Sequence, residues 1–234
     1  MKTNVTNPPA PPAAKSSKQR RIFLVDDHPV TRHGLATLIN QQSDVVVCGE
    51  ADSGPLAIEM IPKAAVDLAI IDITLKTTSG IELLKNLKAL LPDLIVLIMS
   101  MHDESLYAER SLRAGARGYV MKHEQSEVVL GAIRRVLAGE LHVGDGIKEK
   151  LLNRLAHGRK GAESFSMDTL SDREMEVFRL IGNGFGTRQI AERLNLSVKT
   201  IDSYREHLKI KLQLESGSEL VHHAIQWMKT EGVV

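Results

Sequence analysis

Five polar residues stand at the ends of apolar stretches in this sequence: Asp26 and Asp27, Asp72, Ser100 and Lys122. Each stretch has the length and composition of a buried β-strand, and in a parallel sheet the carboxyl ends of the strands meet where ligands bind. Three carboxylates at one edge repel each other unless a cation lies among them, and oxygen ligands of this kind suit Mg²⁺. A lysine and a hydroxyl beside the cation favour an arriving anion. The set predicts a site that holds a phosphoryl group on Asp72, whose carboxylate would act as the nucleophile.

Each of these residues also has an ordinary structural explanation. An aspartate after a strand commonly caps a helix or forms a turn, and a lone lysine is usually solvated. Suitable side chains at the ends of four different strands are much less expected by chance, so the functional interpretation is favoured. His28 is interpreted as a loop or helix-start residue rather than a ligand.

An α/β domain with a parallel sheet would bring these side chains together. Apolar runs that do not alternate with polar residues indicate strands buried on both faces, and segments of helical periodicity separate them. Residues 21–138 are therefore predicted to form a flavodoxin-like domain of five strands and five helices. The strand candidates are 21–25, 45–48, 66–72, 94–99 and 116–120, and the helix candidates are 29–40, 56–61, 81–91, 106–114 and 128–137.

The same residues resemble the motif set of response-regulator receiver domains: Asp26-Asp27, Asp72 followed by Gly80, Ser100, and the run from Gly118 to Lys122. The resemblance implies that Asp72 accepts phosphate from a histidine kinase and that Mg²⁺ is the cofactor. Its further implications are roles for named residues: Asp26, Asp27, Asp72 and the backbone carbonyl of Thr74 as metal ligands, Ser100 and Lys122 as partners of the phosphoryl group, and Tyr119 as the switch aromatic coupled to Ser100.

Two positions depart from the family pattern. Leu75-Lys76 stand where the family often has Met-Pro, and His123 follows Lys122 where some subgroups have proline. Neither change removes a chemical group from the predicted pocket.

The composition is that of an ordinary soluble protein, with 43% hydrophobic and 25% charged residues and a formal net charge of +1. No run approaches the roughly 18 apolar residues of a membrane span, and the single cysteine, Cys48, suits a reducing compartment. Residues 1–20 contain several prolines and no apolar segment, so they are predicted to be a disordered tail rather than a signal peptide. Residues 139–167 are predicted to be a linker with a short helix.

The C-terminal part has the pattern of a helix-turn-helix unit. Ser171 and Glu174 form a capping-box signature at the start of one helix, and a short helix is expected over 187–194. Ser197 would cap a longer helix over 198–212, whose residues Ile201, Leu208 and Leu212 share one face. Ser216 would cap a final helix that suits a packing or dimer surface. Two helices joined by a short turn, the second polar on one side, favour entry into a DNA major groove.

Charge alone does not favour DNA binding, because the segment from Glu163 onward carries nine basic and eleven acidic residues. The specific residues do favour it: Leu170-Ser171-x-Arg173-Glu174, the run 190–194 and the run 197–201 resemble LuxR-type DNA-binding domains. The resemblance covers residues 168–230, and acidic Asp202 and Glu206 depart from it. It implies phosphate and base contacts by Lys199, Thr200, Ser203, Tyr204, Arg205, His207 and Lys211.

Together the two parts resemble the NarL/FixJ class of two-component response regulators. We therefore expect a cytoplasmic, phosphorylation-controlled transcription regulator, not an enzyme, that is a homodimer when active and binds double-stranded DNA. Two alternatives stay open: a DNA-binding regulator that needs no phosphorylation, and a protein-binding adaptor. A phosphatase of the haloacid-dehalogenase type would require a second carboxylate at position 74. This chain has Thr74 there, which counts against that alternative.

Overall fold

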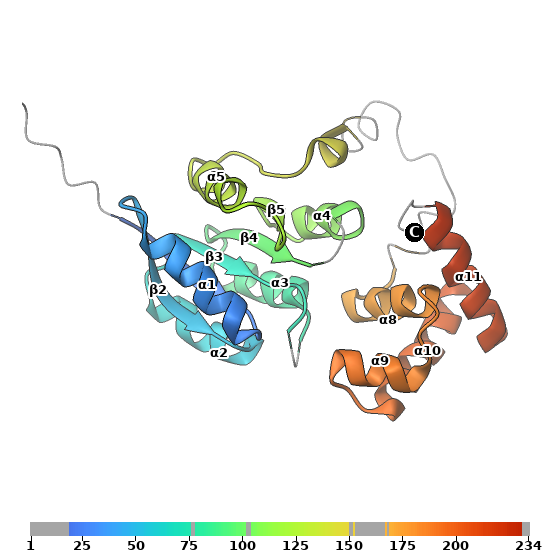
Figure 1. The fold of residues 1–234 in the computed structure, drawn as a ribbon. Coiled ribbons are helices and arrows are strands. Elements are labelled where there is room, and N and C mark those ends of the chain that lie inside the picture. Colours follow the sequence, from blue (N-terminus) through green and yellow to red (C-terminus); the bar gives the residue numbers. More distant parts are fainter. Residues whose placement is uncertain are drawn as a thin grey trace, which may run out of the picture.

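The N-terminal part of the computed structural model is a five-stranded parallel sheet in the order β2-β1-β3-β4-β5 (Figure 1). This is the flavodoxin-like order that the sequence predicts. The structure describes residues 19–75, 78–101, 104–149, 152, 167 and 169–230. The strands are β1 (Arg20–Val25), β2 (Val45–Ala51), β3 (Leu68–Ile71), β4 (Ile95–Ser100) and β5 (Gly118–Met121).

Helices cover both faces of the sheet. Buried residues of α1 and α5 pack in one apolar cluster, and those of α2, α3 and α4 pack in a second cluster on the other face. Burial on both faces explains why the central strands are continuous apolar runs. The helices are α1 (Pro29–Asn40), α2 (Gly54–Met60), η1 (Ile61–Lys63), α3 (Gly80–Leu90), α4 (Glu104–Arg113) and α5 (Ser126–Leu137).

Some boundaries differ from the sequence-based expectation. Gly49 lies inside β2 rather than at its end, because the strand continues alongside β1 as far as Ala51. The helix expected over 56–61 ends at Met60, and Ile61 and Pro62 lie in the 3₁₀ turn η1, where the first residues donate no N–H within the helix. Residues 1–18 of the predicted N-terminal tail lie outside the described residues. Arg20, the last residue of that predicted tail, belongs instead to β1.

The start of the predicted linker packs on the outer edge of β5. The Tyr119 N–H donates to the His142 carbonyl over 2.8 Å, and the His142 N–H donates to the Arg117 carbonyl over 3.1 Å. Gly118 permits this approach, because a Cβ there would lie 2.7 Å from the His142 carbonyl oxygen. Val143 and Ile147 are buried, and residues 145–149 are helical.

Between residues 169 and 230 the structure has four helices: α8 (Asp172–Gly182), α9 (Thr187–Leu194), α10 (Val198–Leu212) and α11 (Gly217–Thr230). The predicted capping box is present, since Ser171 and Glu174 bond reciprocally at the start of α8. Ser197 caps α10 and Ser216 caps α11 as expected. Helix α8 packs against α10 and α11 around buried residues such as Phe178, Ile201 and Leu220.

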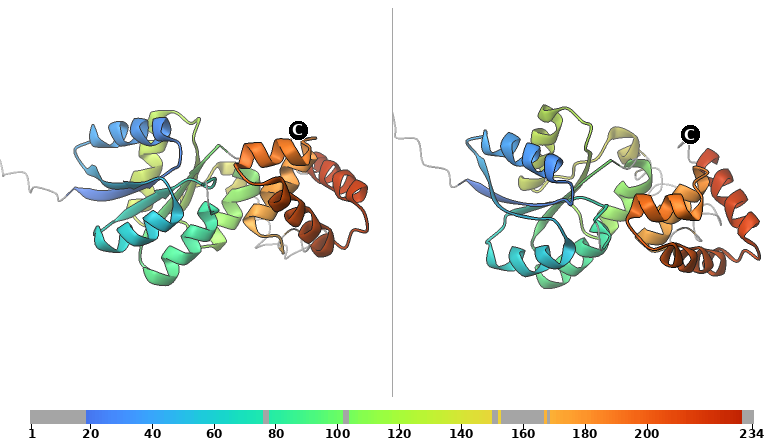
Figure 2. Two further views of the ribbon diagram at one scale, coloured as in Figure 1. Left: turned by 90° about the horizontal axis from the view of Figure 1, so that it is seen from below. Right: turned by 60° about the horizontal axis from the view of Figure 1, so that its bottom comes forward.

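The C-terminal helices lie beyond the carboxyl ends of the strands, with α8 facing the N-terminal part (Figure 2). Buried residues of both parts, among them Leu75, Tyr107, Leu170 and Met175, belong to the same apolar cluster. The edge of the sheet that carries the predicted chemistry therefore faces the C-terminal part. No helix among the described residues is long and apolar enough to cross a membrane.

Candidate functional site

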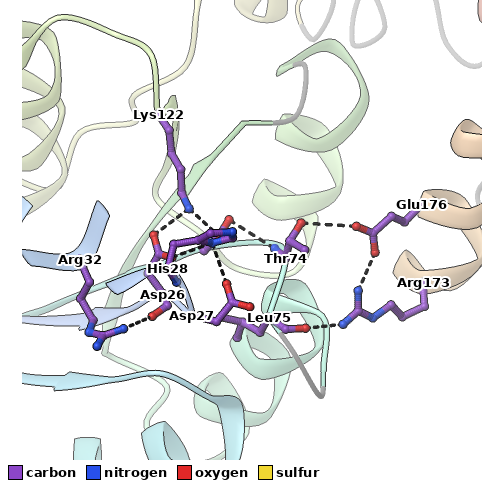
Figure 3. Close-up of polar contacts among 10 residues, drawn as sticks. Asp26, Asp27, His28, Arg32, Thr74, Leu75, Lys122, Arg173 and Glu176 are labelled. Carbon is purple, nitrogen blue, oxygen red and sulfur yellow. Dashed lines mark hydrogen bonds and ion pairs between the residues drawn. The ribbon is translucent and has the colours of Figure 1, made fainter. Parts of the chain in front are cut away.

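The ends of β1, β3 and β5 bring three predicted site residues into direct contact. The Lys122 Nζ lies 2.7 Å from Asp26 Oδ2 and 2.7 Å from Asp72 Oδ2 (Figure 3). All three side chains are buried, at 10% exposure or less. A buried charge persists only when it is paired, so the ammonium and the two carboxylates depend on one another.

The register of the sheet fixes this geometry. The Asp72 N–H donates to the Val25 carbonyl over 2.8 Å, and the Lys122 N–H donates to the Ser100 carbonyl over 2.8 Å. These bonds extend the β1–β3 and β4–β5 ladders by one residue. Asp72 and Lys122 therefore lie at the same level, just past the carboxyl ends of their strands. Gly80 starts α3 directly against this level, because a Cβ there would lie 1.9 Å from the Asp72 carbonyl oxygen.

Burial sets the protonation of this cluster. It raises the pKa of Asp72 to about 6, and the adjacent charge of Lys122 opposes that rise only in part. Burial would lower the pKa of Lys122, but the contacts with Asp72 and Asp26 outweigh it, so this pKa lies above its usual value. The pocket therefore holds an ammonium and a carboxyl group whose ionisation a further cation would favour.

Asp27 and His28 complete the entrance to the pocket. One ligand atom each from Asp26, Asp27, His28 and Asp72 lies within 4.8 Å of the others. Among the described residues Asp27 Oδ1 is buried without a hydrogen bond, although His28 Nδ1 lies 2.8 Å from it without hydrogen-bond geometry. A buried carboxylate oxygen whose near partner is an exposed imidazole, and which lies beside two further carboxylates, fits a hard divalent cation.

The remaining predicted residues line the same end of the sheet. The Thr74 N–H donates to Asp72 Oδ1 over 3.3 Å, and Thr74 forms an isolated bridge with Ser79. Ser100 is fully buried, and its side chain hydrogen-bonds that of buried Tyr119. Burial raises the pKa of Tyr119, so its hydroxyl stays neutral. The structure thus gathers all seven predicted receiver residues around one pocket or directly behind it.

Helix α10 carries the seven residues predicted to contact DNA. Lys199, Ser203, His207 and Lys211 are exposed, and Thr200, Tyr204 and Arg205 are partly exposed. The buried face of the helix consists of Ile201, Leu208 and Leu212, as the sequence pattern predicts. The polar face is therefore free to meet a partner. The departures Asp202 and Glu206 lie on this exposed face, and Glu206 pairs with Lys209 over 2.9 Å.

Two of the candidates, Lys211 and His207, already lie beside Glu174 of α8, and His207 Nδ1 is 3.8 Å from Glu174 Oε1; the contact of Lys211 is the closer one. The Lys211 Nζ lies 2.6 Å from Glu174 Oε2 and 3.3 Å from the Thr169 carbonyl. Burial alone would raise the pKa of Glu174, but the bonds from Lys211 and Ser171 outweigh it and hold this pKa below its usual value. Lys211 thus ties α10 to the start of α8.

Sequence reasoning missed a set of polar contacts between the two parts of the chain. Arg173 donates to the carbonyl of Leu75, and Thr74 Oγ1 lies 3.4 Å from Glu176 Oε1 (Figure 3). Arg173 also donates to the carbonyl of Thr78 over 3.2 Å. On α8 these side chains look like ordinary surface charges of an amphipathic helix. The only signal in the sequence is their position at the start of a helix in a known motif, which says nothing of a partner.

Comparisons with known proteins agree for both parts of the chain. Residues 22–134 match the family described as response regulator receiver domain, and residues 168–224 match the family described as bacterial regulatory proteins, luxR family. A transcriptional activator protein ExaE of Pseudomonas putida is 39% identical, over 88% of this chain and 95% of its own length. An oxygen regulatory protein NreC of Staphylococcus haemolyticus is 33% identical, over 88% of this chain and 97% of its own.

Solved structures are similar over nearly the whole chain. RcsB of Salmonella enterica serovar Typhimurium, bound to the promoter rprA in the presence of the phosphomimetic BeF3⁻, has a TM-score of 0.57 and 26% identity over 88% of this chain and 98% of its own. A structure of two RcsB dimers bound to two parallel DNAs has a TM-score of 0.54 and 26% identity over 88% of this chain and 97% of its own.

Proposed function

Because this chain belongs to the NarL/FixJ class of transcriptional response regulators, which are regulators rather than enzymes, we propose that phosphorylation of Asp72 controls DNA binding through α10. The observation that carries this proposal is the contact of Lys122 with both Asp26 and Asp72 at the carboxyl edge of the sheet. This contact supports the proposal because the carboxylate that we assign as nucleophile, the carboxylate that we assign as cation ligand and the Lys122 ammonium share one buried pocket.

In the phosphorylation step the Asp72 carboxylate attacks the phosphorus atom of the donor, and the bond from phosphorus to the donor's leaving group breaks. Lys122 stabilises the negative charge on the transferring group, because its ammonium is held beside the acceptor. Ser100 lies at the end of the neighbouring strand, and we infer that its hydroxyl would donate to a phosphoryl oxygen. The donor partner is a phosphorylated protein or small molecule, and we infer that the cognate donor is a histidine kinase.

Mg²⁺ is the cation that this pocket suits. Receiver domains generally bind Mg²⁺ at an acidic pocket, and the carboxylates of Asp26, Asp27 and Asp72 with the carbonyl of Thr74 would hold it here. When bound, it would neutralise charge on the acceptor and the phosphoryl group. The buried Asp27 oxygen without a hydrogen bond and the raised pKa of Asp72 support a cation at this point.

DNA would meet the exposed face of α10. Lys199 and Arg205 are suited to phosphates, and Ser203 and His207 to base edges in the major groove. LuxR-type domains bind DNA, and related RcsB dimers have been solved on DNA. We infer that the active form is a homodimer on double-stranded DNA, and that the protein acts in the cytoplasm, where its DNA lies.

Intact-mass measurement tests the phosphorylation step directly. The protein is incubated with Mg²⁺ and acetyl phosphate beside the variants Asp72→Ala and Asp52→Ala. Asp52 also follows a strand but is exposed, so it serves as the matched control. One phosphoryl adduct on the wild type and on Asp52→Ala, absent from Asp72→Ala, is the expected result. No adduct on the wild type would favour a regulator that works without phosphorylation.

A salt titration of DNA binding tests the second step. The logarithm of the binding constant falls linearly with the logarithm of salt concentration when phosphates are contacted. We expect this slope for both the phosphorylated and the unphosphorylated protein. Phosphodonor treatment should tighten DNA binding by the wild type but not by Asp72→Asn. A binding constant that does not depend on salt would favour the protein-binding adaptor.

A further inference from the structure

Arg32 reaches back from α1 to the first residue of the acidic pair. Its Nη1 donates to the Asp26 carbonyl over 2.6 Å (Figure 3). Its Nε donates over 3.0 Å to Oε2 of Glu50, a carboxylate near the end of β2. The Arg32 side chain is 20% exposed, so this contact lies largely under the surface. One guanidinium therefore joins the turn between β1 and α1 to the neighbouring strand.

The fold explains why these groups meet. In the β1–β2 ladder Glu50 lies opposite Leu24, whose side chain packs in the same apolar cluster as Ile39 of α1. Residues directly opposite each other in a sheet share one face, so the Glu50 side chain lies on the α1 side of the sheet. The Arg32 N–H donates to the His28 carbonyl over 3.0 Å, which places Arg32 one helical turn after the acidic pair.

The end of β2 holds Asp26 on both sides. The Asp26 N–H donates to the Ala51 carbonyl over 3.2 Å, and its carbonyl accepts from Arg32, which Glu50 holds in turn. The side chain is oriented as well, because Asp26 Oδ1 accepts the His28 N–H over 2.8 Å. None of the predicted site residues lies on β2, so the contribution of this strand is to fix the residue that carries a proposed cation ligand.

The position and the charge of Arg32 lead to opposite expectations. A positive charge close to a cation site repels the cation, so by charge alone the loss of Arg32 would tighten Mg²⁺ binding. If the guanidinium instead fixes the turn, its loss leaves the carboxylates to be ordered when the cation binds, which weakens binding. The bridge to Glu50 favours the second expectation, because the Glu50 carboxylate offsets the charge while the geometry is kept.

We propose that Arg32 is a positioning residue for the Mg²⁺ site and that Glu50 holds it in place. This inference rests on the proposed function, in which Asp26 and Asp27 bind Mg²⁺ beside the acceptor Asp72. The bridge keeps both carboxylates of the turn between β1 and α1 in place before the cation arrives. The affinity for the cation, rather than the rate of phosphoryl transfer at saturating cation, depends on this bridge.

Titration calorimetry with Mg²⁺ alone on the full chain measures this affinity. The variants are Arg32→Gln, Arg32→Lys, Glu50→Ala, and Arg32→Gln combined with Glu50→Ala. Arg134→Gln is the matched control, because the Arg134 Nε also pairs with a carboxylate of the same domain, that of Asp44, over 2.8 Å. Neither Arg134 nor Asp44 is a predicted site residue. Thermal melts check that each variant is folded.

We expect about tenfold weaker Mg²⁺ binding for Arg32→Gln, which is a usual cost of losing a group that orients a metal ligand. Arg32→Lys should be nearly as weak, because an ammonium keeps the charge but lacks the planar fork that joins a carbonyl to a carboxylate. Glu50→Ala should weaken binding less. The double variant should be no weaker than Arg32→Gln, because both changes break one bridge. Arg134→Gln should match the wild type.

The rate of adduct formation from acetyl phosphate gives a second measurement when it is followed against Mg²⁺ concentration. For Arg32→Gln the half-saturating Mg²⁺ concentration should rise about tenfold, while the rate at saturating Mg²⁺ stays within about twofold of the wild type. A merely structural role for Arg32 would lower the melting temperature without this separation of affinity from rate.

Equal Mg²⁺ affinities of the wild type and Arg32→Gln would overturn the inference. Tighter binding by Arg32→Gln, with Arg32→Lys like the wild type, would also overturn it and would show that Arg32 acts by its charge. If Arg32→Gln does not fold, Glu50→Ala decides, because Glu50 is 40% exposed: weaker binding supports the inference and equal binding refutes it. A wild type that binds no Mg²⁺ or forms no adduct would instead refute the proposed function.

Discussion

The pocket at the end of the sheet and the polar face of α10 use charge in opposite ways. In the pocket Asp26, Asp72 and Lys122 are buried and satisfied by one another. On α10 Lys199 and His207 are exposed. Preorganised buried groups act at full strength in a low dielectric, whereas exposed groups gain their contacts only when a partner arrives and are screened by salt. Single substitutions should therefore be severe in the pocket and graded on the helix.

Lys122→Met gives the largest expected effect. It removes the only ammonium that contacts Asp72 within the described residues, so the rate of adduct formation from acetyl phosphate should fall by about 100-fold or more. Lys63→Met, which removes an exposed lysine paired with Glu59, is the control and should leave the rate unchanged. Equal rates for Lys122→Met and wild type would break the contrast between the two regions.

Glu174→Gln tests a charge of the C-terminal domain that, like those in the pocket, is buried and paired with a lysine. Loss of its charged bonds to Lys211 and Ser171 should lower the free energy of unfolding by about 1.5–3 kcal/mol at neutral pH. Because the pKa of Glu174 is held below 4.5, its contribution is present above that pH and is lost as the pH falls through the lower folded value. Wild type and variant should therefore converge in acid.

Denaturant titrations at several pH values measure this difference. Glu192→Gln on α9 is the control, because Glu192 is exposed and should change stability by less than about 0.5 kcal/mol. A gap between wild type and Glu174→Gln that persists unchanged at low pH would contradict the assignment to the carboxylate.

Lys199→Ala should have a smaller effect. It should weaken DNA binding by about fivefold at moderate salt, and by the same factor for different DNA sequences. Removal of one phosphate contact should also reduce the slope of log K against log salt by about one. Lys211→Ala sharpens the comparison, because Lys211 is paired with Glu174 and its loss should lower stability more than DNA affinity. A binding titration and a melt on each variant separate the two.

His28→Ala should have the smallest effect. The His28 side chain is 62% exposed, and exposed ion pairs contribute at most about 1 kcal/mol. Adduct formation with Mg²⁺ should stay within about twofold of wild type, a difference of well under 1 kcal/mol in barrier height. A large loss of Mg²⁺ affinity would show instead that His28 is a ligand.

The sequence alone located the pocket because parallel topology makes distant residues predictable. Asp26, Asp72, Ser100 and Lys122 each follow an apolar run, and the carboxyl ends of such runs must converge. The helices over 187–194 and 198–212 were predictable for a similar reason, since the apolar face of each and the Ser197 cap of the second are local signals.

No local pattern in the sequence predicts that α8 packs against the N-terminal part. Arg173 and Thr78 are 95 residues apart, and Glu176 and Thr74 are 102 residues apart, so no local period links them. Arg173 and Glu176 also lie at helix positions where charge is normally solvated. Their burial follows from the placement of one domain on the other, which is a property of tertiary packing rather than of any segment.

The pairing of His142 with β5 also decides where the N-terminal domain can be cut. An exposed edge strand offers unpaired backbone groups to other chains, and β5 would be such an edge without this segment. A fragment that ends at residue 138 would lose the buried side chains of Val143 and Ile147 together with the two backbone bonds. Such a fragment should aggregate where one that continues through residue 149 stays monodisperse.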